Sequence, residues 1–468
     1  MSSAPTTTPT TRPADALPAL VAALPDDVVV TDAARTEKYR WDRSQDPHVG
    51  TPLAVVRAED AAQVQTAVRW AAEHGVPVVP RGTGTGLSGG ASAVDGGIVL
   101  SLERMTDVQV DTACQVVVVG PGALNKDVKA AAARHGLWYP PDPSSYEICS
   151  IGGNIATNAG GLCCVKYGVT SDYVLGLDVV LADGTLVTLG GPRIKDVAGL
   201  SLLQLFVGSE GTLGVVTRAI LRLEPEQAVG ATMVAAFPTM SAAAEAVVAI
   251  RRRLRPSMLE LMDQPSIRAV EAFRPMGLDT DAGALLVAQS DAPGTACGVE
   301  VEAMRAACEA AGSTDVFVTE DADEGELFVQ ARRLVVPAVE PLGELMLEDV
   351  GVPVPRLPEL VDAVAAVAAR HDLLIPVVAH AGDGNTHPLI VVPRGDEEAR
   401  LRALAAFDEI MHAAIGLGGT ITGEHGVGRT KRSALPAQLG DDVMALTRRV
   451  KDALDPAGIL NPGAILEA

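Results

Sequence analysis

The sequence predicts an α+β fold with more than one domain, and three observations carry this prediction. The chain has 468 residues, and at roughly 100–200 residues per domain this length corresponds to about two to four domains. Residues 52–223 are rich in glycine and in short β-branched runs, which are typical of strands. Near Gln227 the pattern changes to an alternation of strands and helices. Hydrophobic residues make up 48% of the chain, so a large core can form without crosslinks.

The elements expected in the first half follow from local patterns. Residues 1–45 should comprise a Thr/Pro-rich tail and a short amphipathic helix from about Ala14 to Leu24. In residues 46–227, apolar residues recur at helical spacing over 59–75, and Gly75 ends that helix. Asp183 and Gly184 predict a hairpin turn. The remaining expectations here are a helix at 124–137 and strands at 52–56, 76–80, 96–102, 114–120, in both arms of 175–190 and at 213–226.

The second half predicts a different layout. Residues 228–395 are expected to form a second α+β domain, and residues 396–468 a C-terminal helical segment. The elements expected are strand, helix and strand over 233–263, a strand at 283–291, and helices at 296–311, 397–414 and 441–454.

Charge and composition exclude several classes of partner. Acidic residues outnumber basic residues by 59 to 37, and the formal charge of −22 repels nucleic acid and anionic membrane surfaces. Aromatic residues make up only 3% of the chain, which argues against a stacking platform for bases. An anionic substrate would therefore need a local cationic pocket.

Targeting signals and cysteines indicate a compartment. The N-terminus lacks the basic and apolar regions of a signal peptide, and no apolar run approaches the roughly 20 residues that span a bilayer. The 6 cysteines include the neighbours Cys163 and Cys164 but no C-x-x-C motif, so they predict neither a disulfide framework nor a thiolate zinc site. We expect a soluble cytoplasmic protein without a transmembrane segment.

A glycine-rich loop is the first strong motif. Gly84, Gly86 and Gly89 satisfy the G-x-G-x-x-G pattern of nicotinamide-binding Rossmann folds. That site requires a helix at the glycines, whereas the following residues, up to a strand near Ile98, leave too little chain for a crossover of about 10–12 residues. Backbone amides of such a loop can still close on a phosphate, with help from Arg81. A glycine-rich surface loop is the alternative.

Two short motifs concentrate histidine and carboxylate. His380 and His387 lie in VVAHAGDGNTHPLIVV, where they should face each other at the neck of a hairpin, and Glu424 and His425 lie in ITGEHGVG. Two imidazoles and a carboxylate suit Zn²⁺ or Mn²⁺ with an open coordination position. From spacing alone, structural histidines with satisfied hydrogen bonds are an equal alternative.

Four long motifs follow the glycine loop along the chain. They are PPDPSS (140–145), SIGGNIATNAGG (150–161), VKYGVTSDYVLGLDVVLADG (165–184) and LFVGSEGTLGVVT (205–217). With these motifs the chain, over roughly residues 40–465, resembles the FAD-linked oxidase family with the vanillyl-alcohol-oxidase (PCMH) type of flavin domain. Within it, the chain is similar to the D-lactate dehydrogenase, glycolate oxidase FAD subunit and D-2-hydroxyglutarate dehydrogenase group. The resemblance implies a two-subdomain FAD-binding domain, an α+β substrate (cap) domain with an antiparallel sheet, and a C-terminal helical segment that returns to the flavin.

The resemblance also implies cofactor contacts. Thr85 stands where some relatives carry a histidine linked to the flavin, so FAD should be non-covalent. Cys163–Cys164 stands where relatives often carry arginine, and we expect these thiols to serve packing. The implied FAD residues are Arg81, Gly82, Thr83, Gly84, Thr85 and Gly86 at the pyrophosphate, Pro141, Asp142 and Asn461 near the isoalloxazine, Gly153, Asn154, Asn158, Gly160 and Gly161 at the second phosphate and ribose, and Gly214 and Val216 at the adenine.

The catalytic residues come from the same resemblance. It assigns His380, His387 and Glu424 as metal ligands and His425 as the general base. Arg332 matches the arginine that clamps the substrate carboxylate, whereas Arg333 is expected to be a solvated charge or a structural pair. Lys431 matches a family lysine, with a solvated surface lysine as an equal alternative. Relatives acting on 2-hydroxyglutarate hold the distal carboxylate with a lysine and an asparagine, at positions that here correspond to Leu347 and Leu389.

The expected function is FAD- and metal-dependent oxidation of a lactate- or glycolate-like D-2-hydroxyacid to the 2-oxoacid. The hydride would pass to flavin N5 and the proton to His425. A protein, a quinone or O₂ would accept the electrons, and a homodimer is compatible with the sequence. The alternatives are a catalytic FAD subunit that is active only within a multi-component glycolate-oxidase-type complex, a D-2-hydroxyglutarate dehydrogenase, and a non-redox flavoenzyme like the alkylglycerone-phosphate synthases.

Overall fold

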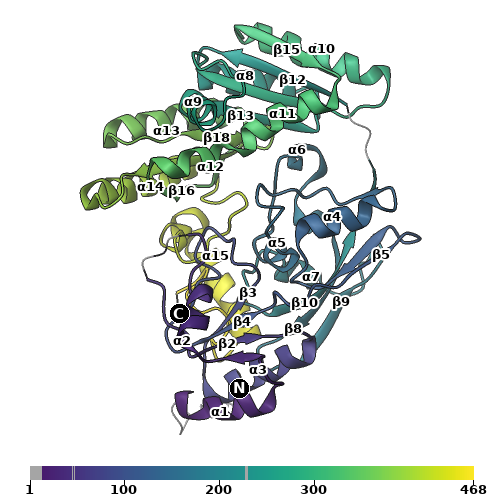
Figure 1. The fold of residues 1–468 in the computed structure, drawn as a ribbon, viewed down its shortest axis with the longest axis vertical. Coiled ribbons are helices and arrows are strands. Elements are labelled where there is room, and N and C mark those ends of the chain that lie inside the picture. The colour runs from purple at the N-terminus through teal and green to yellow at the C-terminus, as the bar shows by residue number, and fades with distance from the viewer. Residues whose placement is uncertain (1–12, 45, 47, 227–229, 468) are drawn as a thin grey trace.

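The computed structural model describes residues 13–44, 46, 48–226 and 230–467 (Figure 1). The chain forms a lower body, which holds both ends of the described chain, and an upper body, which runs from β12 (Ala231–Phe237) to α14 (Glu397–Gly416). The Thr/Pro-rich tail predicted at 1–12 and the predicted domain boundary at 227/228 lie outside the described residues.

The first subdomain of the lower body is a four-stranded sheet in the order β1-β2-β4-β3. β2, β4 and β3 are parallel, and β1 joins them antiparallel. Asp60 caps α3 by accepting a hydrogen bond from Gln63 N at 2.8 Å, and Gly75 ends the helix at φ 63°, which confirms the predicted helix end. Its elements are α1 (Pro13–Ala23), β1 (Val29–Val30), α2 (Ala33–Thr36), β2 (Ala54–Arg57), α3 (Ala61–His74), β3 (Val78–Arg81) and β4 (Ile98–Ser101).

The second subdomain is a five-stranded antiparallel sheet in the order β5-β6-β10-β8-β9. The hairpin predicted around Asp183 and Gly184 joins β8 to β9, with Gly184 at φ 76°. The helix predicted at 124–137 is shorter and ends at Ala133. Its elements are β5 (Val108–Asp111), β6 (Val116–Val119), α4 (Asn125–Ala133), β7 (Leu137–Trp138), α5 (Ile151–Thr157), α6 (Cys164–Tyr167), β8 (Val174–Val180), β9 (Leu186–Gly190), α7 (Leu203–Phe206), β10 (Val215–Arg222) and β11 (Glu224–Pro225).

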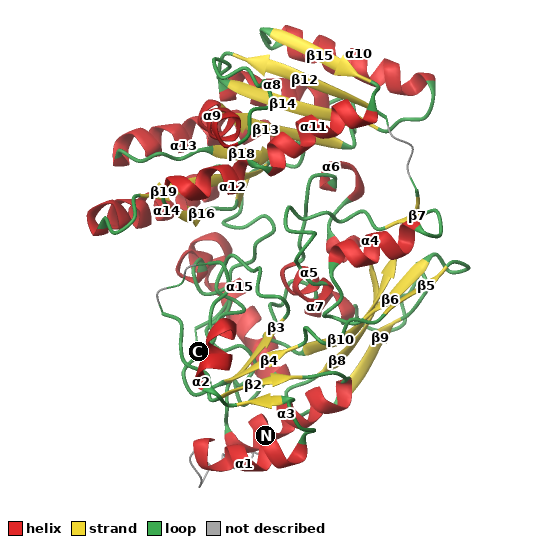
Figure 2. Ribbon diagram, in the orientation of Figure 1, coloured by secondary structure: helices red, strands yellow, loops and turns green. Residues whose placement is uncertain are grey.

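The chain between β3 and β4 contains no helix, and this confirms that the glycine motif is not a Rossmann site. Residues 82–97 cross as an irregular loop between two parallel strands that are neighbours in the sheet. The loop glycines therefore lie at the carboxyl end of β3, on the side of the sheet that faces the upper body (Figure 2).

The upper body is an eight-stranded antiparallel sheet with helices on both faces (Figure 2). Side chains alternate along β12, so that Met233 and Ala235 pack with α8, α10, α13 and α14, whereas Val234 and Ala236 pack with α9, α11 and α12. Its elements are β12 (Ala231–Phe237), α8 (Met240–Arg251), β13 (Met258–Asp263), α9 (Gln264–Phe273), β14 (Ala284–Ser290), α10 (Thr295–Ala310), β15 (Asp315–Thr319), α11 (Ala322–Arg333), α12 (Val335–Val339), β16 (Glu344–Leu347), β17 (Val350–Gly351), α13 (Leu357–His371), β18 (Val377–His380), β19 (Asn385–Val392) and α14 (Glu397–Gly416).

The predicted boundary at residue 395 does not coincide with a break in packing. α14 buries Ala403, Ile410 and Met411 in the core of the upper sheet, so it belongs to the cap body. α15 (Leu435–Leu454) includes the predicted helix at 441–454 and carries a break at Gly440. The chain then returns to the lower body, where Asn461 N donates a hydrogen bond to Val78 O at 2.8 Å.

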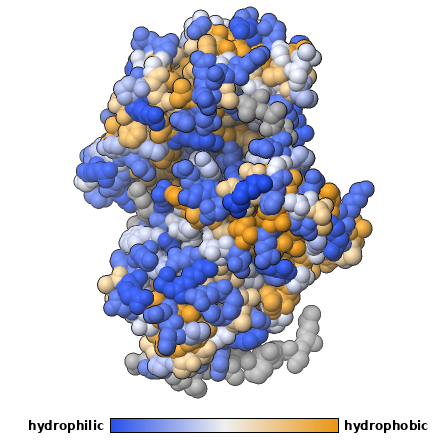
Figure 3. Space-filling view, turned by 45° about the vertical axis from the view of Figure 1, so that its right-hand side comes forward, coloured by the Kyte–Doolittle hydropathy of each residue, from blue (hydrophilic) through white to orange (hydrophobic). Residues whose placement is uncertain are grey.

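The surface and the cysteines are ordinary for such a fold. Hydrophilic residues cover most of the face shown in Figure 3. Among the residues described, no helix combines the length and the apolar character needed to cross a membrane. All 6 cysteines are free, as the sequence predicts.

The packing of α14 can be tested with two positions on the same helix. Ile410→Ala empties a fully buried position and should lower the free energy of unfolding by about 2–5 kcal/mol. Leu404→Ala changes a side chain that is 48% exposed and should cost about 0.5 kcal/mol or less. Urea unfolding of both variants measures the difference, and equal losses would contradict the packing of α14 on the cap sheet.

Candidate active site

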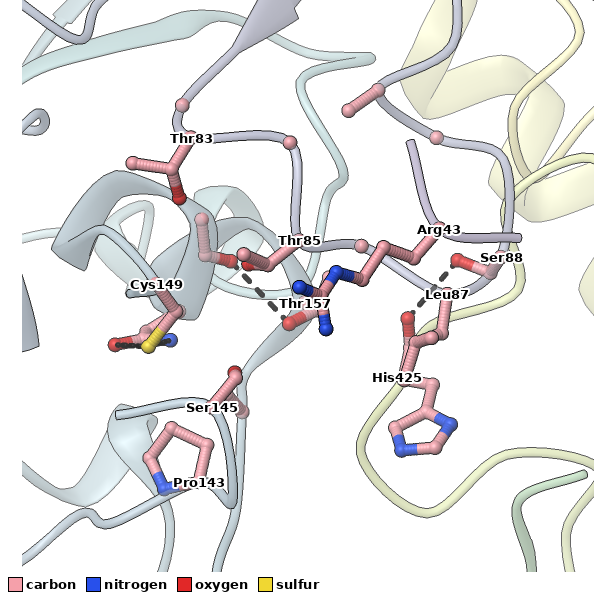
Figure 4. Close-up of a pocket in the computed structure, with 18 of the residues that line it drawn as sticks. Arg43, Thr83, Thr85, Leu87, Ser88, Pro143, Ser145, Cys149, Thr157 and His425 are labelled. Carbon is pink, nitrogen blue, oxygen red and sulfur yellow. Dashed lines mark hydrogen bonds between the residues drawn. The ribbon is translucent and has the colours of Figure 1, made fainter. Parts of the chain in front are cut away.

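The main cavity, of about 920 Å³, lies between the loops of the lower body and the cap. The lower body contributes residues 80–88, residues from the segment 143–157, residues from 209–216 at the start of β10, and Arg43. The side chain of Arg43 points toward the middle of the cavity (Figure 4). The cap contributes α12, β16 and parts of its helix and strand ends. Five arginines line the cavity, namely Arg43, Arg81, Arg332, Arg333 and Arg394. Five glutamates line it as well, namely Glu147, Glu210, Glu340, Glu344 and Glu424, so the cavity offers individual cationic groups to an anionic ligand rather than a net positive charge.

The glycine loop has the close packing of a phosphate cradle. Gly84 has φ 78°, and a Cβ there would lie 1.9 Å from Arg81 Nη2, so no other residue fits without moving the guanidinium. A Cβ at Gly82 would lie 2.1 Å from Ser150 Oγ. Thr83 Oγ1 is buried without a hydrogen-bond partner among the described residues, so it is available to a ligand.

The predicted FAD residues divide into two groups. The cavity is lined by Arg81, Gly82, Thr83, Gly84, Thr85, Gly86, Gly153, Asn154, Gly214 and Val216. The residues outside the cavity lining are Pro141, Asp142, Asn158, Gly160, Gly161 and Asn461. Pro143, Ser144 and Ser145, the next residues along the chain from Pro141 and Asp142, do line the cavity.

Residues outside the lining support the cavity wall. Asp142 Oδ1 accepts a hydrogen bond from Cys163 N at 3.2 Å, and Asn158 ends α5 in the left-handed conformation. Gly160 and Gly161 line a second cavity, of about 480 Å³, together with Cys164, His380 and Glu424. The buried Cys163 thiol donates to Pro140 O at 3.2 Å, which agrees with the expected packing role.

Asn461 lies behind the glycine loop, away from the cavity. Its amide nitrogen donates to Gly90 O at 2.8 Å and to Glu210 O at 2.7 Å, and its oxygen accepts from Arg429 Nη2 at 3.0 Å. The Glu210 carboxylate accepts hydrogen bonds from Val427 N at 2.7 Å and Gly428 N at 2.8 Å. Burial raises the pKa of Glu210 to about 7, although these two amides oppose the shift.

His380, His387 and Glu424 come together as the sequence predicts. Nε2 of each histidine lies 3.2 Å from Glu424 Oε1, and the two rings meet edge to face with centroids 5.0 Å apart. Burial would lower the pKa of His380, but Glu260 and Glu424 raise it well above its usual value. Burial would likewise raise the pKa of Glu424, but His380 holds it well below its usual value. The cluster thus favours a positive charge between the imidazoles and the carboxylate, as a bound cation would provide.

Glu260 is a buried carboxylate that links the cluster to Arg332. His380 Nδ1 lies 2.8 Å from Glu260 Oε1, and Arg332 Nε lies 2.9 Å from Glu260 Oε2. A histidine that binds a metal through one nitrogen usually donates its other N–H to such a carboxylate. Nε and Nη2 of Arg332 are both buried without a hydrogen bond among the described residues, so the contact with Glu260 is an ion pair that lacks hydrogen-bond geometry. Arg332 therefore lines the cavity with two nitrogens that can still donate.

His425 lies beside the ligand cluster and stacks on His387, with ring centroids 4.9 Å apart and 12° between the planes. Its carbonyl oxygen accepts a hydrogen bond from Ser88 Oγ at 3.0 Å (Figure 4). Burial lowers the pKa of His425 to about 4, an effect that the nearby Asp349 only partly offsets. The imidazole is therefore neutral near pH 7 and can accept a proton.

Lys431 does not line the cavity and is not a surface residue. It is 1% exposed, and Nζ donates to Glu348 Oε2 at 2.7 Å, to Ile421 O at 2.8 Å and to Asp349 O at 3.0 Å. The solvated alternative is therefore wrong. Arg333 is half-buried and lies 3.6 Å from Asp142 and 3.3 Å from Glu326, which fits the expected structural pair.

The two leucines that replace polar residues of 2-hydroxyglutarate relatives lie side by side. Leu347 on β16 is the register partner of Leu389 on β19, and Leu347 lines the cavity. Leu345, Val336 and Val378 extend the same apolar wall. The wall offers no donor for a second carboxylate.

Three buried carboxylates, Glu260, Glu348 and Asp349, were not predicted from the sequence motifs. Each is completely buried and contacts a residue that the motifs did identify. The available signal was a charged residue within an apolar run, as in MLELMD and LMLEDVG.

Comparisons with known proteins identify the family of the chain. Residues 52–190 match the family described as "FAD binding domain", and residues 226–465 match "FAD linked oxidases, C-terminal domain". Glycolate oxidase subunit GlcD of Bacillus subtilis (strain 168) is 40% identical over 91% of this chain and 91% of its own. D-lactate dehydrogenase of Archaeoglobus fulgidus is 35% identical over 92% of this chain and 96% of its own.

Two solved structures share the fold. p-Cresol methylhydroxylase has a TM-score of 0.81 at 18% identity, over 97% of this chain and 96% of its own. 4-Ethylphenol oxidase from Gulosibacter chungangensis has a TM-score of 0.80 at 18% identity, over 98% of both chains. These likenesses confirm the predicted fold, a two-subdomain flavin domain of the PCMH type with an α+β cap.

The close approach at Gly84 predicts a loss of FAD. In Gly84→Ala the new Cβ collides with the Arg81 guanidinium, and FAD affinity should fall about tenfold or more, a change of roughly 1.4 kcal/mol or greater. Gly277→Ala is the matched control, because Gly277 has φ 77° but no atom within 4 Å of its Cβ position. FAD titration of both apoproteins measures the effect, and equal affinities would contradict a cradle at Gly84.

Proposed function

The chain belongs to the FAD-linked oxidase family and is an FAD-dependent hydroxyacid oxidoreductase, and on that premise we propose that it oxidises a small D-2-hydroxyacid to the 2-oxoacid with the help of a divalent metal ion. One observation carries the proposal: Arg332, His425 and the cluster of His387 and Glu424 line one cavity together with the glycine loop. The names of the two relatives, a glycolate oxidase subunit and a D-lactate dehydrogenase, support this class of substrate.

FAD fits the part of the cavity formed by the glycine loop. Thr83 Oγ1, buried without a partner among the described residues, and the cradle at Gly84 suit an anionic, phosphate-bearing group. When bound, FAD supplies the acceptor for the substrate hydride. Thr85 lines the cavity and has no group that links to a flavin, so we propose non-covalent binding. Flavin that stays with the acid-precipitated chain would contradict it.

A divalent metal ion fits between His380, His387 and Glu424. Two imidazole nitrogens and one carboxylate oxygen suit Zn²⁺ or Mn²⁺, and the contact of His380 Nδ1 with Glu260 fixes the ring for such a role. When bound, the ion supplies a Lewis acid that lowers the pKa of the substrate hydroxyl.

The side chains around this centre would hold the substrate and move its proton. Arg332 Nη2 would donate to the substrate carboxylate, because it has no hydrogen-bond partner among the described residues, while Nε lies 2.9 Å from Glu260 Oε2 and keeps the guanidinium beside that carboxylate. His425 is neutral at pH 7 and would accept the hydroxyl proton at Nε2, which faces the ligand cluster 4.0 Å from Glu424 Oε1.

The apolar wall favours a substrate with one carboxylate. A second carboxylate placed against Leu347 and Leu389 would lose its hydration without gaining a donor, at a cost on the order of several kcal/mol. Lactate- or glycolate-like acids therefore fit better than D-2-hydroxyglutarate.

A catalytic subunit within a multi-component oxidase is the second candidate. The Bacillus subtilis and Escherichia coli relatives are named as subunits. On the flavin domain, Ile194, Val197 and Leu200, in the loop that follows β9, are 77–97% exposed apolar side chains. The electron acceptor is then a partner protein rather than a quinone or O₂.

Anaerobic flavin bleaching by a panel of 2-hydroxyacids tests the proposal. D-lactate or glycolate should reduce the flavin of the pure chain. D-2-hydroxyglutarate should do so at least tenfold less efficiently, because a tenfold loss corresponds to only about 1.4 kcal/mol, which is less than the cost of desolvating its second carboxylate. Turnover with an artificial acceptor separates the two candidates, because a chain that needs partner subunits would bleach or turn over only in their presence. No reduction by any 2-hydroxyacid in either setting would overturn the proposed reaction.

Arg332→Lys tests the carboxylate clamp while keeping the charge beside Glu260. Loss of the second guanidinium nitrogen should lower kcat/KM by about 10- to 100-fold, or roughly 1.5–3 kcal/mol, with normal FAD content. Arg400→Lys is the control, since Arg400 forms a partly exposed ion pair with Glu344 and is not part of the cavity lining. Steady-state kinetics that match the wild type would show that another cation holds the carboxylate.

Chelation tests the metal site separately from the flavin. Removal of the ion should abolish oxidation of 2-hydroxyacids and leave FAD bound, because the ligands and the glycine loop are separate parts of the cavity, and Zn²⁺ or Mn²⁺ should restore activity. His387→Ala should lose metal, whereas His371→Ala, which removes an outer pair with Glu409, should keep it. Full activity of a metal-free protein would mean that these histidines are structural.

A further inference from the structure

We propose that Asp349 is a positioning residue that holds His387 and His425 in the orientation and tautomer needed for metal binding and proton abstraction. The proposal rests on the proposed function. Asp349 lies between β16 and β17, is 0% exposed, and does not line the main cavity. Its two carboxylate oxygens have separate environments.

One oxygen organises the backbone of the GEHG loop. Asp349 Oδ2 accepts hydrogen bonds from Gly423 N at 2.9 Å, Glu424 N at 3.0 Å and His425 N at 2.8 Å. The hydroxyl of Thr422 donates to the same atom at 2.7 Å. Four donors on one oxygen fix the path of the loop, and with it the places of the carboxylate ligand and of the general base.

The carboxylate also faces both imidazoles. His387 Nδ1 lies 3.6 Å from Asp349 Oδ1, and His425 Nδ1 lies 4.0 Å from Oδ2. Both Nδ1 atoms and Oδ1 are buried and have no hydrogen-bond partner among the described residues, so at 3.6 and 4.0 Å the imidazoles lie beside the carboxylate without a hydrogen bond to it. Asp349 is therefore the acceptor available to both Nδ1–H groups.

This arrangement decides which nitrogen of each ring carries the proton. A neutral imidazole has one N–H and one lone pair, and the partner of one nitrogen sets the state of the other. With Nδ1–H directed at Asp349, the Nε2 lone pair of His387 faces Glu424 Oε1 at 3.2 Å. The Nε2 lone pair of His425 faces the same ligand cluster at 4.0 Å, where a substrate hydroxyl would lie. Asp349 thus orients both His387 as the metal ligand and His425 as the general base.

Asp349 is itself held rigidly. Lys431 Nζ donates to its carbonyl oxygen at 3.0 Å and to the neighbouring Glu348 at 2.7 Å. This gives Lys431, predicted as catalytic, a place one contact behind the reacting groups.

The same atoms allow one different assignment. Asp349, His387 and His425 also lie close enough to hold a cation of their own. A second ion would use the Nδ1 atoms as ligands and leave no proton there. The number of ions per chain distinguishes this assignment from the positioning role.

Asp349→Asn in the full-length holoprotein is the test. The amide keeps the shape but presents N–H groups, and in enzymes where a carboxylate holds the Nδ1–H of a catalytic histidine this change lowers kcat about 10⁴-fold with the geometry intact. FAD content should stay normal and Zn²⁺ affinity, measured by competition with a chromophoric chelator, should fall about 10- to 100-fold. At saturating Zn²⁺, kcat for flavin reduction by D-lactate should fall about 10²- to 10⁴-fold with little change in KM.

Two further variants make the result specific. Glu271→Gln is the matched control, because its carboxylate organises a cap loop through hydrogen bonds from Met276 N, Gly277 N and Leu278 N, and it should match the wild type. Thr422→Val removes one of the four donors to Asp349 and should show the same split between kcat and KM with a smaller loss. If Asp349→Asn does not fold, Thr422→Val must show that split for the proposal to stand.

Three outcomes overturn the positioning role. They are wild-type metal affinity and kcat in Asp349→Asn, a loss that only follows the folded fraction, and two ions per wild-type chain with one in the variant. Failure of the proposed function is distinguishable, because it would appear as absence of flavin reduction in the wild type, while the Zn²⁺ affinities still report on His387.

Discussion

The loop from Gly423 to Gly428 is held by two buried carboxylates that come from different bodies of the protein, and the active site depends on this double attachment. Asp349 of the cap binds the start of the loop, and Glu210 of the flavin domain binds its end through Val427 N and Gly428 N. Position 428 requires glycine, because its φ is 51° and because a Cβ there would lie 1.9 Å from Ser88 O. The loop thereby brings Glu424 and His425 against both His380 and His387 of the cap and the glycine loop of the flavin domain.

Charge compensation is local in this acidic protein. Glu260 is completely buried, yet Arg332 and His380 lie on either side of it, and Glu348 is paired with Lys431. Removing one partner of such a buried pair typically costs about 3–5 kcal/mol, so each group depends on its neighbour. The same pairs leave Arg332 Nη2 without an internal partner, and the cavity gains a cation even though the whole chain carries a formal charge of −22. An anionic substrate in this cavity would thus meet a short-range attraction that works against the long-range field.

The β18–β19 hairpin connects the cap core to the chemistry. Val378 is the register partner of His387 and His380 that of Asn385, so both histidines belong to strands whose other residues are buried. Ligands on strands of a packed sheet are held more firmly than ligands on loops. Glu424 and His425 lie on a loop without this support, and their backbone is held instead by hydrogen bonds to Asp349. Leu347 and Leu389 belong to the same sheet and place an apolar wall beside the charged groups.

The sequence by itself determined the fold class, the family, the absence of a Rossmann crossover and the set of His380, His387, Glu424 and His425, because these rest on local spacing and on motifs that survive without tertiary contacts. It also placed most glycine-loop residues at the cavity. Only the tertiary structure decided that α14 packs on the cap, that Asn461 and Lys431 support the site from behind, and that Pro143–Ser145 rather than Asp142 line the cavity. Glu260 and Asp349 have no local motif, since their importance comes from burial beside groups 120 and 76 residues away. A buried charge is stabilised by its partners, and only the fold brings those partners beside it.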